Sequence, residues 1–155
     1  MFQQTFTKNQ AVPKIRHYCA YQERCHSEVK EKLYSFGLNK KEVNELLSQM
    51  IEEQYLNEER FALLFAGGKF RMKKWGKVKI NYELKKKQVS AYCIKKALAS
   101  IDISDYIRTL KKHTADKLKN LRSEKNIFIK KKKVQSYLLQ KGFESSLVNE
   151  MVGKI

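Results

Sequence analysis

Proline and glycine are scarce in this sequence, with one proline and six glycines among 155 residues. Tight turns and long active-site loops depend on these residues, so their scarcity argues against a turn-rich all-β protein. No run of about 18 apolar residues is present, and we therefore expect no membrane-spanning helix. The first ten residues also lack the apolar segment of a secretory signal.

Cysteine is also rare, and Cys19, Cys25 and Cys93 have no spacing typical of a disulfide framework. An odd number of thiols is typical of proteins of the reducing cytoplasm, where we expect this one to reside. A zinc site built from these thiols with His17 and His26 is disfavoured. Residues two apart on a helix point to different sides, and adjacent side chains cannot easily chelate one ion. We predict no metal site and no cofactor.

Acidic residues are few compared with basic ones. The chain has 16 Asp and Glu against 33 Lys and Arg, which gives a net charge of +17. Residues 1–56 carry a net charge of only +1, whereas residues 57–102 and residues 103–155 carry +8 each. A surface that positive favours a polyanion as partner, and nucleic acid is the first class to consider. We expect that surface in the last two thirds, and a neutral packing or partner-contacting unit in the first third.

An apolar template recurs three times, at offsets of 51 and 54 residues. Its spacing is typical of two amphipathic helices joined by a tight turn. The copies are Val29, Leu33, Gly37, Leu38, Val43 and Leu47; Ile80, Leu84, Gln88, Val89, Ile94 and Leu98; and Val134, Leu138, Gly142, Phe143, Val148 and Val152.

The turn between the two helices has recognisable signals in the first copy. Gly37 lies where a helix ends in a left-handed residue, and Asn39 with Glu42 forms a capping box for the next helix. In the second copy Gln88 replaces the glycine, so that turn is either built differently or strained. Ser90 is the expected cap of the helix that follows it.

A further helical segment precedes each pair. In the second copy Asn57 is the expected cap, and Phe61, Leu64, Phe65 and Phe70 are the expected buried face. The third copy is expected to open at Ser104-Asp105, and Arg16 to Arg24 is a weaker equivalent in the first. Residues 127–129 are the one β-like run, and it is too isolated to form a sheet.

These patterns predict an all-α protein made of three tandem three-helix repeats in an elongated array. The predicted ranges are an N-terminal tail at 1–13 and repeats at 14–56, 57–102 and 103–155.

No catalytic constellation is evident. Gly67-Gly68-Lys69 lacks the spacer and the following hydroxyl residue of a phosphate-binding loop, and we interpret it as a kink or a close helix approach. None of the 16 carboxylates pairs convincingly with a base or a metal site. We therefore predict that the protein is not an enzyme.

Three basic clusters are the candidate binding residues. Such groups bind phosphates without reading sequence, although each could instead be a solvated helix face that keeps the protein soluble. Because the clusters occupy related repeat positions with few acids nearby, we predict binding to single- or double-stranded DNA without sequence preference. They comprise Lys69, Arg71, Lys73, Lys74, Lys77 and Lys79; Lys85, Lys86 and Lys87; and Lys130, Lys131, Lys132 and Lys133.

Trp75 lies within the first basic cluster, directly before a glycine. Its indole could stack on a base or enter a pocket of a partner, or it could hold the start of the following helix. The sequence leaves both interpretations open.

The segment Tyr55–Ala62, followed by Trp75-Gly76 and an Ile-x-x-Glu-Leu pattern, resembles the RecX regulatory proteins. The resemblance implies a non-enzymatic modulator that binds the RecA–DNA filament, and we expect the protein to be a monomer. It also implies inhibition of the ATPase, strand-exchange and co-protease activities of RecA, and so modulation of DNA repair and the SOS response. Gln88 departs from the family, which more often has glycine there. The motif residues, expected to be mostly structural, are Leu56, Arg60, Phe61, Ala62, Gly76, Ile80, Glu83 and Leu84.

A tandem helix-turn-helix transcription regulator is the alternative. Readers of DNA sequence place Arg, Asn or Gln on a recognition helix. The corresponding helices here offer Asn44, Glu45 and Gln49 in one copy, and Ala91, Tyr92 and Lys95 in the next. These residues are poor material for contacts to base edges, so the alternative is the weaker hypothesis.

Overall fold

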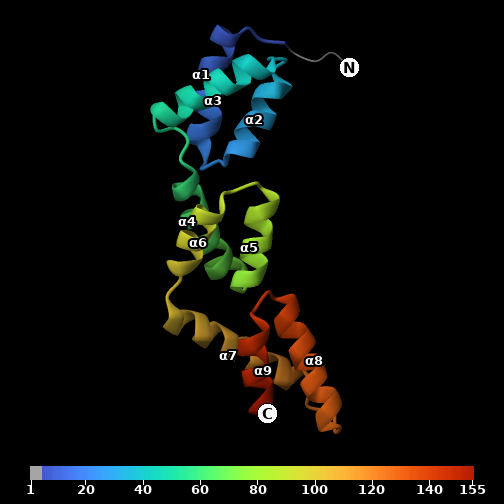
Figure 1. Cartoon of the computed structure of the whole chain (residues 1–155). Coiled ribbons are helices and arrows are strands. Elements are labelled where there is room, and N and C mark those ends of the chain that lie inside the picture. The colour runs from blue at the N-terminus through green and yellow to red at the C-terminus, as the bar shows by residue number, and fades with distance from the viewer. Residues whose placement is uncertain (1–4) are drawn as a thin grey trace. The chain divides into compact units, whose positions relative to one another are not determined.

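The computed structural model describes residues 5–155, and over this range the chain forms nine α-helices, one π-helical turn and no strand (Figure 1). The all-α prediction is confirmed. Residues 1–4 of the predicted tail lie outside the described residues. The elements are α1 (Lys8–Tyr21), α2 (His26–Ser35), α3 (Lys40–Glu52), α4 (Glu58–Gly68), the π-helical turn η1 (Lys69–Lys73), α5 (Lys77–Lys86), α6 (Ala91–Ala99), α7 (Ile103–Asn120), α8 (Ile127–Gln140) and α9 (Ser145–Gly153).

The chain divides into two compact units. The first unit runs to Leu64 and takes in Leu84–Lys96, and the second unit comprises Phe65–Glu83 and Ala97–Ile155. The net charge of the first unit is +5 and that of the second is +12. The excess of positive charge therefore belongs mainly to the second unit. The predicted repeat boundaries stay predictions.

The first helix starts earlier than the sequence indicated. Thr7 accepts a hydrogen bond from the Gln10 amide at 3.2 Å, and the Gln10 side chain accepts one from the Thr7 amide at 3.0 Å. This capping box begins α1 at Lys8, inside the segment assigned to the tail. Ile15 on α1 is fully buried in the core shared with α2 and α3.

The turns inside the three copies share one backbone conformation. Gly37 and Gly142 have φ values of 85° and 97°, as predicted for glycine after a helix. Gln88 takes the same left-handed conformation, with φ at 61°. The second copy therefore keeps the turn and accepts strain, because a residue with a β-carbon is disfavoured there.

The predicted caps of the first two copies are confirmed. Asn39 accepts from the Glu42 amide at 2.9 Å, and the Glu42 side chain bonds back to the Asn39 amide. Asn57 caps α4 through the Arg60 amide at 2.9 Å, and Ser90 Oγ accepts from the amide three residues later at 3.3 Å.

The predicted buried face of α4 was partly wrong. Phe61 and Phe70 are buried and Phe65 is half-buried, but the side chain of Leu64 is 53% exposed. Two residues along a helix turn about 200° around its axis, and the buried positions Ala62 and Ala66 both lie two residues from Leu64. Leu64 therefore faces away from the core.

The predicted start of the third copy also needed correction. Asp102, rather than Ser104-Asp105, opens the third copy, because its side chain accepts from the Asp105 amide at 3.0 Å and α7 begins at Ile103. Residues 127–129 form the first turn of α8, which Asn126 caps. The expectation that this run forms no sheet is confirmed, and its apolar side chains are exposed at the start of the helix.

Candidate nucleic-acid interface

The basic segment between α4 and α5 begins with a change of helix type. At Lys69 the α-helical pattern gives way to the π-helical turn η1, which ends at Lys73 and is followed by Lys74 with φ at 58°. Gly67-Gly68-Lys69, interpreted from the sequence as a kink or a close helix approach, spans this transition. Of the predicted basic residues here, Arg71, Lys73 and Lys74 are exposed.

Trp75 is half-buried between two lysines of the first basic cluster. The Lys69 Nζ lies 5.2 Å from the indole ring and the Lys79 Nζ lies 4.7 Å from it. These cation–π contacts fix the ring beside η1 and draw both ammonium groups to it. The indole therefore contacts lysines of both η1 and α5, and its partly open surface stays a candidate contact.

Lys77 is used for packing rather than left free on the surface. Its amide donates to the buried Tyr106 hydroxyl at 2.9 Å, and its Nζ lies 5.0 Å from the Tyr106 ring. The Tyr106 hydroxyl in turn donates to Glu144, the residue that precedes α9. Burial, with the hydrogen bond to Glu144 adding to it, raises the pKa of Tyr106 well above its ordinary value. Tyr106 is therefore a neutral connector between α5, α7 and α9.

Gly76 of the predicted motif is required by close packing. It is buried, and a β-carbon at this position would collide with the backbone of Gly142 and Phe143. A side chain has no room here, so the glycine is structural.

A groove of about 450 Å³ lies between η1 and α7 within the second unit. The cations Arg71, Lys74, Arg108 and Lys112 line it, together with Phe70, His113 and two aspartates. The Arg108 guanidinium pairs with Asp105 at 2.8 Å. Because four cations and two aspartates line the groove, an excess of positive charge is present along it.

His113 connects the two walls of this groove, because its Nε2 lies 2.9 Å from the Lys74 carbonyl oxygen. Burial lowers the pKa of His113 below its ordinary value, although the Lys74 carbonyl opposes this shift. Arg108, Lys112 and His113 were not among the residues predicted from the sequence. The run Lys111-Lys112-His113 was a possible signal, but only the packing of α7 against η1 places it beside Arg71.

The third basic cluster lies on α8. Lys130 and Lys131 are half-buried, whereas Lys132 and Lys133 are exposed. The Lys132 Nζ lies 5.5 Å from the exposed Phe128 ring, and the Lys133 Nζ lies 3.8 Å from Glu124. This cluster belongs to the second unit, like the residues around η1.

The remaining predicted cluster lies in the first unit, at the end of α5. Lys85 and Lys86 are exposed, and Lys87 is half-buried. The Lys87 carbonyl accepts from Ser27 Oγ at 2.7 Å, and its Nζ lies 3.9 Å from Glu28. Lys87 therefore ties the end of α5 to the start of α2.

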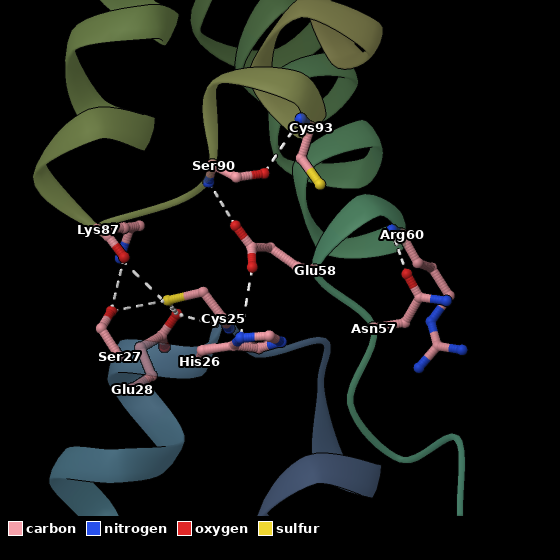
Figure 2. Close-up of polar contacts among 10 residues, drawn as sticks. All are labelled: Cys25, His26, Ser27, Glu28, Asn57, Glu58, Arg60, Lys87, Ser90 and Cys93. Atoms are coloured by element: carbon pink, nitrogen blue, oxygen red, sulfur yellow. Dashed lines mark hydrogen bonds and ion pairs between the residues drawn. The ribbon is translucent and has the colours of Figure 1, made fainter. Parts of the chain in front are cut away.

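Glu58, an acidic residue of the segment Tyr55–Ala62, connects three helices within the first unit (Figure 2). The Glu58 carboxylate contacts His26 Nδ1 at 3.3 Å and also accepts from the Ser90 amide. One carboxylate at the start of α4 thus holds the starts of α2 and α6. Cys25, which is buried, precedes α2 and donates to Glu28 at 3.0 Å.

The other motif residues also serve packing or local bonding. Arg60 lies 2.5 Å from Glu23 and donates to the Gln54 carbonyl at 3.2 Å. Glu83 is half-buried. The buried members are Leu56, Phe61, Ala62, Ile80 and Leu84.

Neither a metal site nor a membrane span is found in the described part of the chain. Across residues 5–155, no group of three or more His, Cys, Asp or Glu side chains is placed to hold a metal ion. Within the same range no helix combines the length and the apolar character needed to cross a bilayer.

Comparison with known protein families gives two matches. A family model described as RecX, second three-helix domain, matches residues 57–98, and one described as RecX, third three-helix domain, matches residues 104–152. Together these matches cover more than half of the chain.

Curated relatives carry the description Regulatory protein RecX. The relative from Clostridium acetobutylicum is 28% identical over 135 residues, which cover 85% of this chain and 62% of that protein. The relative from Oceanobacillus iheyensis is 22% identical over 152 residues, which cover 98% of this chain and 56% of that protein. This chain therefore spans less than two thirds of the length of either relative.

Solved structures share the fold. One described as regulatory protein RecX has a TM-score of 0.85 at 23% identity and matches 96% of this chain and 72% of its own. RecX from Lactobacillus salivarius has a TM-score of 0.82 at 21% identity, with 95% of each chain covered. At such identities the likeness establishes the arrangement of helices.

Proposed function

This chain belongs to the RecX family, and from that premise we propose that it binds the RecA–DNA filament and restrains the recombinase. In this proposal the protein lowers ATP hydrolysis, strand exchange and co-protease activity by RecA, and so modulates DNA repair and the SOS response. It acts in the cytoplasm as a monomer, needs no cofactor and catalyses no reaction of its own.

The observation that carries the proposal is the concentration of positive charge in the second unit. That unit has a net charge of +12, against +5 for the first. A cationic surface that displaces counterions from phosphates binds DNA without reading its sequence, and the binding weakens as salt rises. A nucleoprotein filament offers such phosphates along its length.

The predicted basic residues differ in exposure and in their contacts with aromatic rings. Lys77 and Lys79 are half-buried and contact aromatic rings, so we assign them mainly to packing. Arg71 and Lys73 are exposed on η1, and Arg71 lines the groove that α7 completes. We propose that these two residues contact phosphate directly. Lys132 and Lys133 of the second unit, and separately Lys85 of the first unit, are exposed and stay candidates for phosphate contact.

A double charge reversal tests the surface. The variant Arg71→Glu/Lys73→Glu removes two exposed cations from η1, whereas Lys30→Glu/Lys40→Glu makes the same change in charge at exposed positions of α2 and α3. The measurement is fluorescence anisotropy of labelled single-stranded DNA, with and without RecA, over a range of salt concentrations.

We expect the η1 variant to bind at least about tenfold more weakly and with a smaller salt slope, because each lost phosphate contact reduces that slope by about one. The α2–α3 variant should bind like the parent protein. Equal affinities and equal slopes for both variants would remove η1 from the interface. Tight binding to one short duplex, with no response to RecA, would favour a transcription regulator instead.

A further inference from the structure

A second groove, of about 750 Å³, lies on the first unit between α1 and α2. Cationic and aromatic side chains line it, and no carboxylate is among the described residues that do so. The first 56 residues carry a net charge of only +1, so this local excess of cations is not a consequence of overall composition. The six side chains that matter here are Lys14, His17, Tyr18, Tyr21, Arg24 and Lys32.

The wall of the groove is a fixed arrangement of cations on rings. The Arg24 guanidinium lies 3.8 Å from the centre of the Tyr18 ring and also donates to the Tyr18 carbonyl at 3.1 Å. The Lys32 Nζ lies 5.4 Å from the same ring and 5.7 Å from the ring of Phe36. These contacts hold Lys32 at the surface of an apolar wall, where a partner meets charge and hydrophobic area together, whereas the Arg24 side chain is 13% exposed and pairs with Glu28 at 3.7 Å.

The rim of the groove is open. Lys14, His17 and Tyr21 are exposed, and their spacing of three and four residues places them on one face of α1. The Tyr21 side chain is 76% exposed, so most of its ring is open to a partner. Exposed aromatic residues are enriched at surfaces that bind protein partners.

We propose that this groove binds an acidic segment of a partner protein that carries an apolar or aromatic anchor residue. Its carboxylates would pair with Lys14 and Lys32, and its anchor would lie between Tyr18 and Tyr21. Single-stranded nucleic acid fits less well, because it requires successive open ring faces for stacking and Arg24 already covers one face of Tyr18. This inference does not depend on the proposed function, since it concerns the unit with the lower charge.

The test is fluorescence anisotropy with the full chain and a fluorescein-labelled peptide of Glu and Asp residues around a central Phe. A peptide with Gln and Asn in place of the acids controls for charge, and an oligothymidylate of equal charge serves as competitor. The variant Lys14→Glu/Lys32→Glu reverses two groove cations, and Lys30→Glu/Lys40→Glu makes the same change at exposed positions that do not line the groove. Circular dichroism confirms that each variant is folded.

We expect salt-sensitive binding of the acidic peptide and none of the amide peptide. The groove variant should bind about tenfold more weakly or worse, because opposite charges steer and hold the partner, while the control variant should match the parent protein. Tyr21→Ala should also weaken binding. Equal binding of the two peptides, or equal affinities for the two charge variants, would overturn the proposal. Displacement by oligothymidylate at lower concentration than by unlabelled peptide would assign the groove to nucleic acid, and would also overturn it.

Discussion

The backbone of Gly76, at the start of α5, lies directly against that of Gly142, in the turn between α8 and α9. The Gly76 amide donates to the Lys141 carbonyl at 2.8 Å, and the Val78 amide donates to the Gly142 carbonyl at 2.9 Å. A residue from the second copy of the repeat is thus bonded to the turn of the third. Both glycines are needed for one contact, although they lie far apart in the sequence.

Gly76→Ala should therefore destabilise the protein by about 1–3 kcal/mol, because the added methyl group meets backbone that cannot move aside cheaply. Gly68→Ala is the matched control. Gly68 ends α4 with open space around it, so alanine there should be neutral or stabilise by up to about 1 kcal/mol. Urea unfolding of both variants measures the difference. Equal stabilities would contradict the close approach.

Gln88→Gly should stabilise the protein by about 0.5–1 kcal/mol, because glycine adopts the left-handed conformation without a steric cost. The wild-type residue has φ at 61° and is exposed, so little packing is lost on substitution. Thermal unfolding followed by circular dichroism is the measurement. A lower melting temperature for the variant would show that Gln88 makes a contribution that outweighs its strain.

Tyr106→Phe should cost about 1–3 kcal/mol, because it leaves the Lys77 amide without its acceptor and Glu144 without its donor. The ring itself stays, so no cavity forms. Tyr34→Phe, at a side chain that is 46% exposed, is the matched control and should change stability little. If both substitutions cost the same, the hydroxyl of Tyr106 does not connect the helices as described.

The carboxyl group of Glu53 should titrate far below its usual range. The Arg16 guanidinium bonds to it at 2.7 and 2.9 Å and, with help from Gln49, lowers the pKa of Glu53 to about 2 from 4.5. A lowered pKa in the folded state means that the contribution to stability is present above pH 4.5 and is lost as the pH falls towards 2. Both side chains are partly exposed, so salt should weaken the effect.

Carbon NMR of the Glu53 carboxyl in the parent protein and in Arg16→Gln checks this prediction. The titration midpoint should rise from about 2 towards 4.5 in the variant. A midpoint that is unchanged by the substitution would show that the ion pair does not form in solution.

Local signals in the sequence predicted most of the helices. Gly37, Asn39 and Asn57 act on their immediate neighbours, so their roles follow from spacing alone. Thr7 and Gln10 were an equally clear signal, but they lie before Pro13 in a segment that was interpreted as a tail. The α1 boundary was therefore predictable from the residues present.

Features that depend on tertiary packing were not predictable. Leu64 has the composition of a core residue, and only the packing of α4 shows that it faces away from the core. Arg108 and Lys112 belong to the groove because α7 packs beside η1. Conversely, Lys77 belongs to a basic cluster in the sequence but is engaged with Tyr106. Charge density along the chain indicated the region of the candidate interface. Which residues of that region are candidates for binding depends on the contacts of each side chain.

The most direct test of the central claim is the ATPase activity of RecA on single-stranded DNA while the purified protein is titrated in. We predict that ATP hydrolysis falls with increasing protein, and that Arg71→Glu/Lys73→Glu inhibits more weakly than Lys30→Glu/Lys40→Glu. An ATPase rate that stays constant up to saturating protein would contradict the proposal that this chain restrains the recombinase.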